Sequence, residues 1–171
     1  GRFAVQTLHT QEALSSELQR LQPAELLLAE NLPLDPSAWF QGGITRRQDW
    51  HFDHDACSRL LCQQFGTRDL GGFGLNEQPL AISAAGALLQ YLSETQQSTL
   101  PHITRITLEQ REQSIIIDAA TRRNLELDQA TSGQHTHSLF GLLDNSRTAM
   151  GSRLLRRWIN QPLRNQDTVQ A

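Results

Sequence analysis

The hydrophobic pattern at the start of the chain predicts a strand, an amphipathic helix and a second strand. Residues 1–8 alternate apolar and polar side chains, which is typical of a half-buried strand. Thr10 precedes an apolar stripe at helical spacing that stops before Pro23, so we expect a helix with Thr10 as its N-cap. The apolar run at 24–31 ends before Pro33 and has the pattern of a strand covered on both faces.

The middle of the chain predicts a loop and two helices. Residues 32–49 are rich in Pro and Gly and predict an irregular loop. A helix follows, capped by Asp53 or Asp55 and stopped by Gly66. Asn76 is the expected cap of the next and longest helix. Its expected inward-facing residues are Leu80, Ala84, Ala87, Leu88, Tyr91 and Leu92, with Ile82 and Leu89 widening the stripe.

The pattern changes kind at Asp118. Residues 102–110 and 114–118 read as strands paired through the connection at 111–113. Beyond Asp118 only helical patterns follow, at 119–127, 137–144 (capped by Thr136 or Ser138) and 148–161, with a further helix start at Asp167. The helix at 148–161 carries a stripe expected to face a core, formed by Met150, Leu154, Leu155, Trp158 and Ile159. We therefore divide the chain into an α/β part, 1–117, and an all-helical part, 118–171.

Composition indicates a globular chain of one domain or one and a half. It has 171 residues, 38% of them hydrophobic and 19% charged, with a formal net charge of −3. Residues 1–117 hold 8 Arg and 13 acids, or −5, whereas 118–171 hold 7 Arg and 5 acids, or +2. This balance argues against nucleic-acid binding by bulk charge alone. The chain shows no run of eighteen apolar residues and no leader pattern, so we expect a cytoplasmic protein.

Several kinds of catalytic or metal site are not expected. A P-loop needs a lysine, and the chain contains none. Cys57 and Cys62 lie five apart on a predicted helix, so their side chains diverge and a disulfide is not expected. The stretch "HFDHD" at 51–55 offers ligands for a divalent ion, but helix capping already explains its acids. We therefore predict no metal site and no catalytic residues.

The arginines of the last predicted helix are the strongest candidates for nucleic-acid contact. Arg153, Arg156, Arg157 and Arg164 would form a basic edge near Trp158 that suits phosphates. Arginines beside an apolar stripe more often lie solvated or pair with acids, so we favour a structural role. Arg153, Arg156 and Arg157 remain candidate contacts to the DNA backbone.

Five motifs along the chain closely resemble the bacterial MutS mismatch-repair proteins: "FGTRDLGGFG", "AAGALLQYLSETQ", "LPHI", "DAATRRNLEL" and "TAMGSRLLRRWINQPL". The resemblance implies that 1–117 is a connector domain, an RNase H-like α/β module with a mixed sheet and flanking helices. It implies that 118–171 begins the helical core domain, with "DAATRRNLEL" as the passage between them. Three parts of the family's proteins are expected to have no counterpart in this sequence: the mismatch-reading domain with its Phe-x-Glu wedge, the clamp tips and the ATPase. The connector is expected to lack its first strands.

The resemblance also sets the functional expectation. The parent protein would recognise mismatched DNA as a homodimer and signal with ATP and Mg, whereas this part would be non-catalytic and hold no cofactor. In the family, MutL docks on the connector; the candidate partner surface here is formed by Asp55, Arg59, Gln63 and Gln64, together with the loop that follows.

Two alternatives stay open. One is an RNase H-like metal-dependent nuclease that uses some of Asp49, Asp53, Asp55 and Asp69. The other is a self-contained DNA-binding module that uses the Arg153–Arg164 helix.

Overall fold

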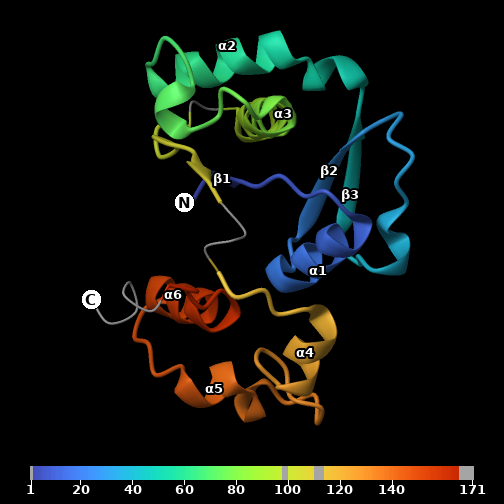
Figure 1. Ribbon diagram of the computed structural model, residues 1–171, viewed down its shortest axis with the longest axis vertical. Coiled ribbons are helices and arrows are strands. Elements are labelled where there is room, and N and C mark those ends of the chain that lie inside the picture. The colour runs from blue at the N-terminus through green and yellow to red at the C-terminus, as the bar shows by residue number, and fades with distance from the viewer. Residues whose placement is uncertain (1, 98–99, 110–113, 166–171) are drawn as a thin grey trace. The chain divides into compact units, whose positions relative to one another are not determined.

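The computed structural model describes residues 2–97, 100–109 and 114–165, and contacts between residues divide the chain into two compact units (Figure 1). The first unit comprises residues 1–15 and 22–109. The second comprises residues 16–21 and 110–171. Within the described ranges, no helix is both long and apolar enough to cross a membrane.

Two parallel strand pairs form the sheets of the first unit. Strand β1 (Ala4–Val5) pairs with β4 (Thr107–Leu108), and β2 (Glu25–Ala29) pairs with β3 (Gly43–Arg47). The pairs form two separate two-stranded sheets, so the chain combines helices with small parallel sheets and is α/β in character. The strands predicted at the start of the chain and at 102–110 are confirmed, each shortened to two residues.

Strand β3 corrects the prediction of an irregular loop at 32–49. Its five residues pair in register with β2, from Glu25 opposite Gly43 to Ala29 opposite Arg47. The Arg46 guanidinium donates hydrogen bonds to four backbone carbonyl oxygens of the connection, those of Ala29, Glu30, Leu32 and Leu34. These long-range bonds order a segment whose Pro and Gly content alone predicts irregularity. The predicted double-sided burial of β2 is wrong, because only Leu28 among its residues is buried.

The helix predicted after Thr10 and the helix predicted before Gly66 are confirmed, together with the residues that begin and end them. Helix α1 (Gln11–Leu21) begins at Thr10, whose Oγ1 accepts the Ala13 N–H at 3.1 Å. Helix α2 (His54–Phe65) follows two short 3₁₀ helices, η1 (Pro36–Ala38) and η2 (Asp49–Phe52). Asp53, not Asp55, caps α2, because its carboxylate accepts the Ala56 N–H at 2.8 Å. Gly66 ends the helix in the left-handed conformation that glycine adopts freely.

Helix α3 (Pro79–Gln96), which follows the 3₁₀ helix η3 (Gly71–Phe73), buries Ile82, Ala87 and Leu89 as predicted, but not the whole predicted stripe. Its N-cap is Gln78 rather than Asn76, without a side-chain hydrogen bond. Leu80 is 75% exposed, and Ala84 and Leu88 are also exposed. The buried residues are Ala81, Ile82, Ala85, Gly86, Ala87 and Leu89. Because the helix is apolar on most sides, the spacing of its apolar residues does not show which side faces the core. The small residues, against which α2 packs closely, determine that side.

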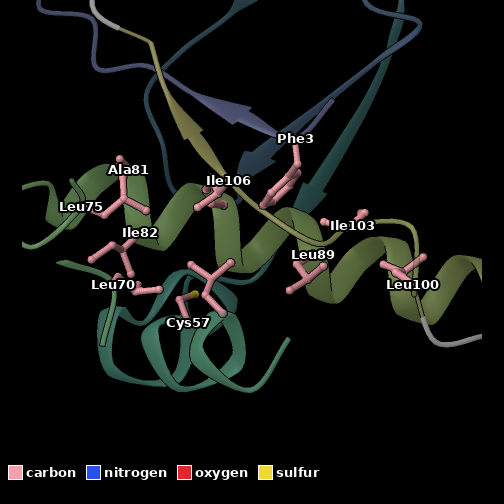
Figure 2. Packing of buried hydrophobic residues seen from close by; sticks show 12 residues of the cluster. Phe3, Cys57, Leu70, Leu75, Ala81, Ile82, Leu89, Leu100, Ile103 and Ile106 are labelled. Carbon is pink, nitrogen blue, oxygen red and sulfur yellow. The ribbon is translucent and has the colours of Figure 1, made fainter. Parts of the chain in front are cut away.

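The core of the first unit lies between α2, α3 and the β1–β4 pair (Figure 2). Leu61 of α2 and Leu75, Leu89 and Leu100 are almost completely buried. The remaining buried members are Phe3, Cys57, Leu70, Ala81, Ile82, Ala85, Ile103 and Ile106. In α2, Leu61 is buried and Leu60 and Phe65 pack against the cluster, whereas Ala56 is exposed.

The second unit confirms the helical pattern beyond Asp118. Its helices are α4 (Ala119–Asn124), the 3₁₀ helix η5 (His135–His137), α5 (Leu139–Leu143) and α6 (Ala149–Asn160). Helices α4, α5 and α6 begin at caps whose side chains accept an N–H three residues on, namely Asp118, Ser138 and Thr148. The helix start predicted at Asp167 lies outside the described residues.

The strand predicted at 114–118 is wrong. Ser114 forms one isolated antiparallel bridge with Leu163, and the Ile115 N–H donates to the Pro162 carbonyl oxygen at 2.8 Å. Ile115 and Ile116 are exposed, so the β-branched run does not enter a sheet. The connection at 111–113 lies outside the described residues, and β4 pairs with β1 instead of with this segment.

Candidate functional site

Helix α2 presents an exposed polar line on the surface of the first unit. Cys57 and Leu61 are buried, which directs the opposite side of the helix outwards. Asp55, Arg59 and Gln63 are exposed and spaced four apart, so they follow one side of the helix. The structure therefore brings three of the four candidate partner-surface residues together.

Gln64 has a different setting. It is half-buried, and its Nε2 donates to the carbonyl oxygens of Leu100 and Ile103, each at 3.0 Å. These bonds fasten the segment that leads towards β4 onto the end of α2. The amide of Gln64 is thus engaged within the unit, while the exposed line consists of Asp55, Arg59 and Gln63.

Close to the start of α2 lies an exposed tryptophan that sequence reasoning missed. Trp50 of η2 is 61% exposed, and its ring stacks on that of buried His51, with 3.5 Å between centroids and 29° between planes. The exposure of Trp50 depends on the tertiary contacts of His51, and no local signal in the sequence reports those.

A polar network fixes this region to α3. His51 contacts Arg47 of β3 through Nε2 at 2.9 Å and Gln90 of α3 through Nδ1 at 3.1 Å. Arg47 also pairs with Glu94 of α3 at 2.7 Å and lies over the Tyr91 ring, 5.8 Å from its centroid. Helix α3 therefore holds β3 and η2 through side chains from two consecutive turns.

A second link joins β2 to the same helix. Glu25 accepts hydrogen bonds from the hydroxyls of Thr45 and Tyr91. The bond from Thr45 and then that from Tyr91 lower the pKa of Glu25, because both stabilise the charged carboxylate. One carboxylate thus ties together both strands of the β2–β3 sheet and α3.

The arginines of α6 in the second unit have two distinct settings. Arg153 and Arg157 are exposed and four residues apart. Arg156 instead donates from Nε to Asp128 Oδ1 at 3.0 Å and lies 5.9 Å from the centroid of the Phe140 ring. Asp128 is buried and also accepts from Asn160 at 3.1 Å. Of the three candidate DNA contacts, Arg156 serves the packing of α6, while Arg153 and Arg157 face solvent.

The stripe on α6 that was expected to face a core is largely exposed. Met150 is 78% exposed, Trp158 60% and Leu154 40%. Leu155 and Ile159 are half-buried, and the only fully buried residue of the helix is Asn160. The assignment of Trp158 as a packing residue is therefore wrong for the described residues, in which Asn160 and Arg156 anchor the helix.

The arginine pair of "DAATRRNLEL" also divides into two settings. Arg123 is exposed, whereas Arg122 is only 8% exposed. Arg122 Nη2 donates to the Ile117 carbonyl oxygen at 3.0 Å, and its Nε and Nη1 have no hydrogen-bond partner among the residues that the structure describes. Burial, and then the nearby charge of Arg20, lower the pKa of Arg122. Within this largely exposed motif, Arg122 and Leu127 are therefore the buried anchors.

The acids proposed for a nuclease serve local structure. Asp49 accepts from Asn31, Asp53 caps α2, and Asp69 accepts the Gly71 N–H. Asp55 contacts the adjacent His54. Across the part of the chain that the structure describes, no three His, Cys, Asp or Glu side chains gather in a way that would hold a metal ion. A two-metal mechanism would need such a group of carboxylates.

Comparison with protein-family models gives two matches. Residues 1–104 match the model described as MutS domain II. Residues 120–171 match the model described as MutS domain III. The first match alone covers more than half of the 171 residues, and the matches occur in the order of the domain numbers.

Proposed function

Because the chain belongs to the MutS family of DNA mismatch-repair proteins, we propose that its first unit is a connector that docks MutL and its second unit begins the core domain. The observation that carries this proposal is the succession of domain II and domain III matches along one chain. We further propose that the connector is RNase H-like in fold, since its parallel strand pairs and helices are compatible with that α/β class. Fold alone carries no activity, so we assign the unit no catalysis.

The docking proposal draws on the exposed line of α2. Asp55, Arg59 and Gln63 combine an acid, a base and an amide on one side of a helix whose other side is fixed in the core. A rigid helix that presents mixed polar groups suits a specific and reversible protein contact. Gln64 supports this surface by fastening the end of the helix.

The other activities of the family are assigned to the parent protein. We propose that mismatched-DNA recognition, ATP and Mg binding, and homodimer formation rest mainly on regions other than these two domains. We also propose that the protein acts in the cytoplasm. In this scheme the two units transmit the mismatch signal and hold no cofactor.

The test is to measure binding of the 171-residue chain to purified MutL, with ATP present, and in parallel to a labelled mismatched duplex. We expect binding to MutL, weakened by a combined Arg59→Ala and Gln63→Ala change and unaffected by Arg153→Ala on α6. Absence of MutL binding, or equal affinities for the double variant and the Arg153→Ala control, would refute the docking role.

A DNA-binding module is the second candidate, favoured by the exposure of Arg153 and Arg157. Two exposed guanidinium groups, four residues apart on one helix, would contact DNA phosphates and give a weak affinity for DNA that depends on salt. Engagement of Arg156 by Asp128 reduces the candidate backbone contacts from three residues to two. Tight duplex binding that falls when both exposed arginines are changed to alanine would favour this function over docking.

A further inference from the structure

Two contacts hold the side chain of Trp50, although the residue is largely exposed. One face of the indole lies on His51, and the indole N–H donates to the side-chain oxygen of Gln48. The exposed fraction of the residue is 61%, among the largest for aromatic residues in the described part of the chain. Exposure of a large apolar ring is unfavourable in water, so a fixed and exposed tryptophan requires an explanation.

The ring beneath Trp50 is itself locked. Both nitrogens of His51 are engaged, by Arg47 and by Gln90, and its backbone carbonyl accepts from the Cys57 thiol at 3.3 Å. Arg47 is an obligate donor, so His51 Nε2 accepts and Nδ1 carries the proton donated to Gln90. The platform under the tryptophan is therefore continuous with the core helices of the unit.

A fixed aromatic ring is the preferred anchor of a protein interface. Tryptophan, tyrosine and arginine dominate binding free energy at interfaces, and a ring that is ordered before binding loses little conformational entropy. Since His51 covers one face of Trp50, the opposite face is available to a ligand group. An aromatic face attracts a cation through its quadrupole.

The charges around Trp50 favour a cationic partner. Asp49, Asp53 and Asp55 lie within five residues of it along the chain and are exposed. The two nearby arginines point elsewhere, because Arg46 binds backbone carbonyls and Arg47 pairs with Glu94. The outward-facing charge of 49–55 is therefore negative.

We propose that Trp50 anchors the docking surface of the first unit and receives an arginine or lysine side chain of the partner against its open face. The neighbouring carboxylates complement the charge of that side chain, and the exposed line of α2 continues the surface. This inference rests on the proposed function, in which the partner is MutL.

Trp158 provides a matched control, since it is 60% exposed on α6 in the second unit. We expect Trp50→Ala to weaken MutL binding about tenfold or more, while Trp158→Ala leaves it unchanged. Trp50→Arg retains a planar group for the stack but places a cation where the partner's cation would bind. It should weaken binding at least as much as alanine at low salt, with part of the loss recovered as salt rises.

The outcomes separate this inference from the proposed function. If MutL binds and Arg59→Ala with Gln63→Ala weakens it, but Trp50→Ala matches Trp158→Ala, then the anchor is refuted and docking stands. If Trp50→Arg binds as tightly as the unchanged chain, the cationic-partner chemistry is refuted. If the unchanged chain does not bind MutL, both proposals fail. Circular dichroism spectra matching that of the unchanged chain confirm that each variant is folded.

Discussion

Gly86 of α3 lies directly against Cys57 of α2. A Cβ atom added at Gly86 would lie 2.3 Å from Cys57 Cβ and 2.7 Å from its Sγ, far inside van der Waals contact. Helices α2 and α3 therefore approach each other closely at this point, and only glycine fits. The contact explains why a glycine occurs within an 18-residue helix, where it lowers intrinsic helix stability.

Replacing Gly86 with alanine should destabilise the first unit. The added methyl group must push against Cys57, and overpacking of this kind costs about 1–3 kcal/mol, only partly offset by the better helix propensity of alanine. Gly72→Ala is the control, because no atom of the described ranges lies within 4 Å of the position that its Cβ would take. Of the two variants, only Gly86→Ala should lower the urea midpoint of unfolding. A higher midpoint for Gly86→Ala than for the unchanged chain would contradict the close approach of α2 and α3.

The Arg156–Asp128 pair should stabilise the second unit. Arg156→Ala would leave the buried Asp128 carboxylate with Asn160 as its remaining donor. We expect the free energy of unfolding to fall by about 2 kcal/mol, which lies within the range for a hydrogen bond between charged groups of which one is buried. Arg153→Ala on the same helix should change stability by less than about 0.5 kcal/mol, since its side chain is exposed. Equal unfolding midpoints for the two variants in urea would show that the pair is not stabilising.

Local signals predicted the helices well. Thr10 and Gly66 act in the structure as expected, and Asp53 and Ser138 each prove to be the cap among two candidates, because capping depends on residues within one turn. The change to an all-helical pattern beyond Asp118 is likewise local. These features required no knowledge of which segments meet in space.

The features that were missed depend on tertiary contacts. Strand β3 forms inside a Pro- and Gly-rich segment because β2 and Arg46 order it. The inward face of α3 is set by the approach of α2 at Gly86. Helical spacing predicted that Asp55, Arg59 and Gln63 share one side of α2, whereas the exposure of Trp50 follows from the setting of His51.

The two thiols should react at different rates with iodoacetamide. Cys57 is buried, and burial followed by the nearby Asp53 carboxylate raises the pKa of its thiol, which lowers the thiolate fraction at neutral pH. Cys62 is half-buried and is expected to react roughly tenfold faster or more, as measured by mass spectrometry of peptides. Unfolding in urea should equalise the rates. Faster labelling of Cys57 than of Cys62 in the folded chain would contradict the burial of Cys57 on the side of α2 that packs against α3.

The cap of α4 should give the second unit an acid-dependent component of stability. Asp118 accepts the Thr121 N–H at 2.7 Å, and this bond lowers the pKa of its carboxyl because it favours the charged form. A carboxyl whose pKa is lower in the folded than in the unfolded state stabilises the fold above the unfolded-state pKa. That contribution is lost as the pH falls through the folded-state pKa.

Asp118→Asn keeps an acceptor for the Thr121 N–H but removes the titrating group. We therefore expect its urea midpoint to fall less steeply than that of the unchanged chain as the solution is acidified from pH 6. Thr148→Ala is the control, because it removes a cap that does not titrate and should lower the midpoint by a similar amount at every pH. If Asp118→Asn leaves the acid dependence unchanged, the charged cap at the start of "DAATRRNLEL" does not contribute to it.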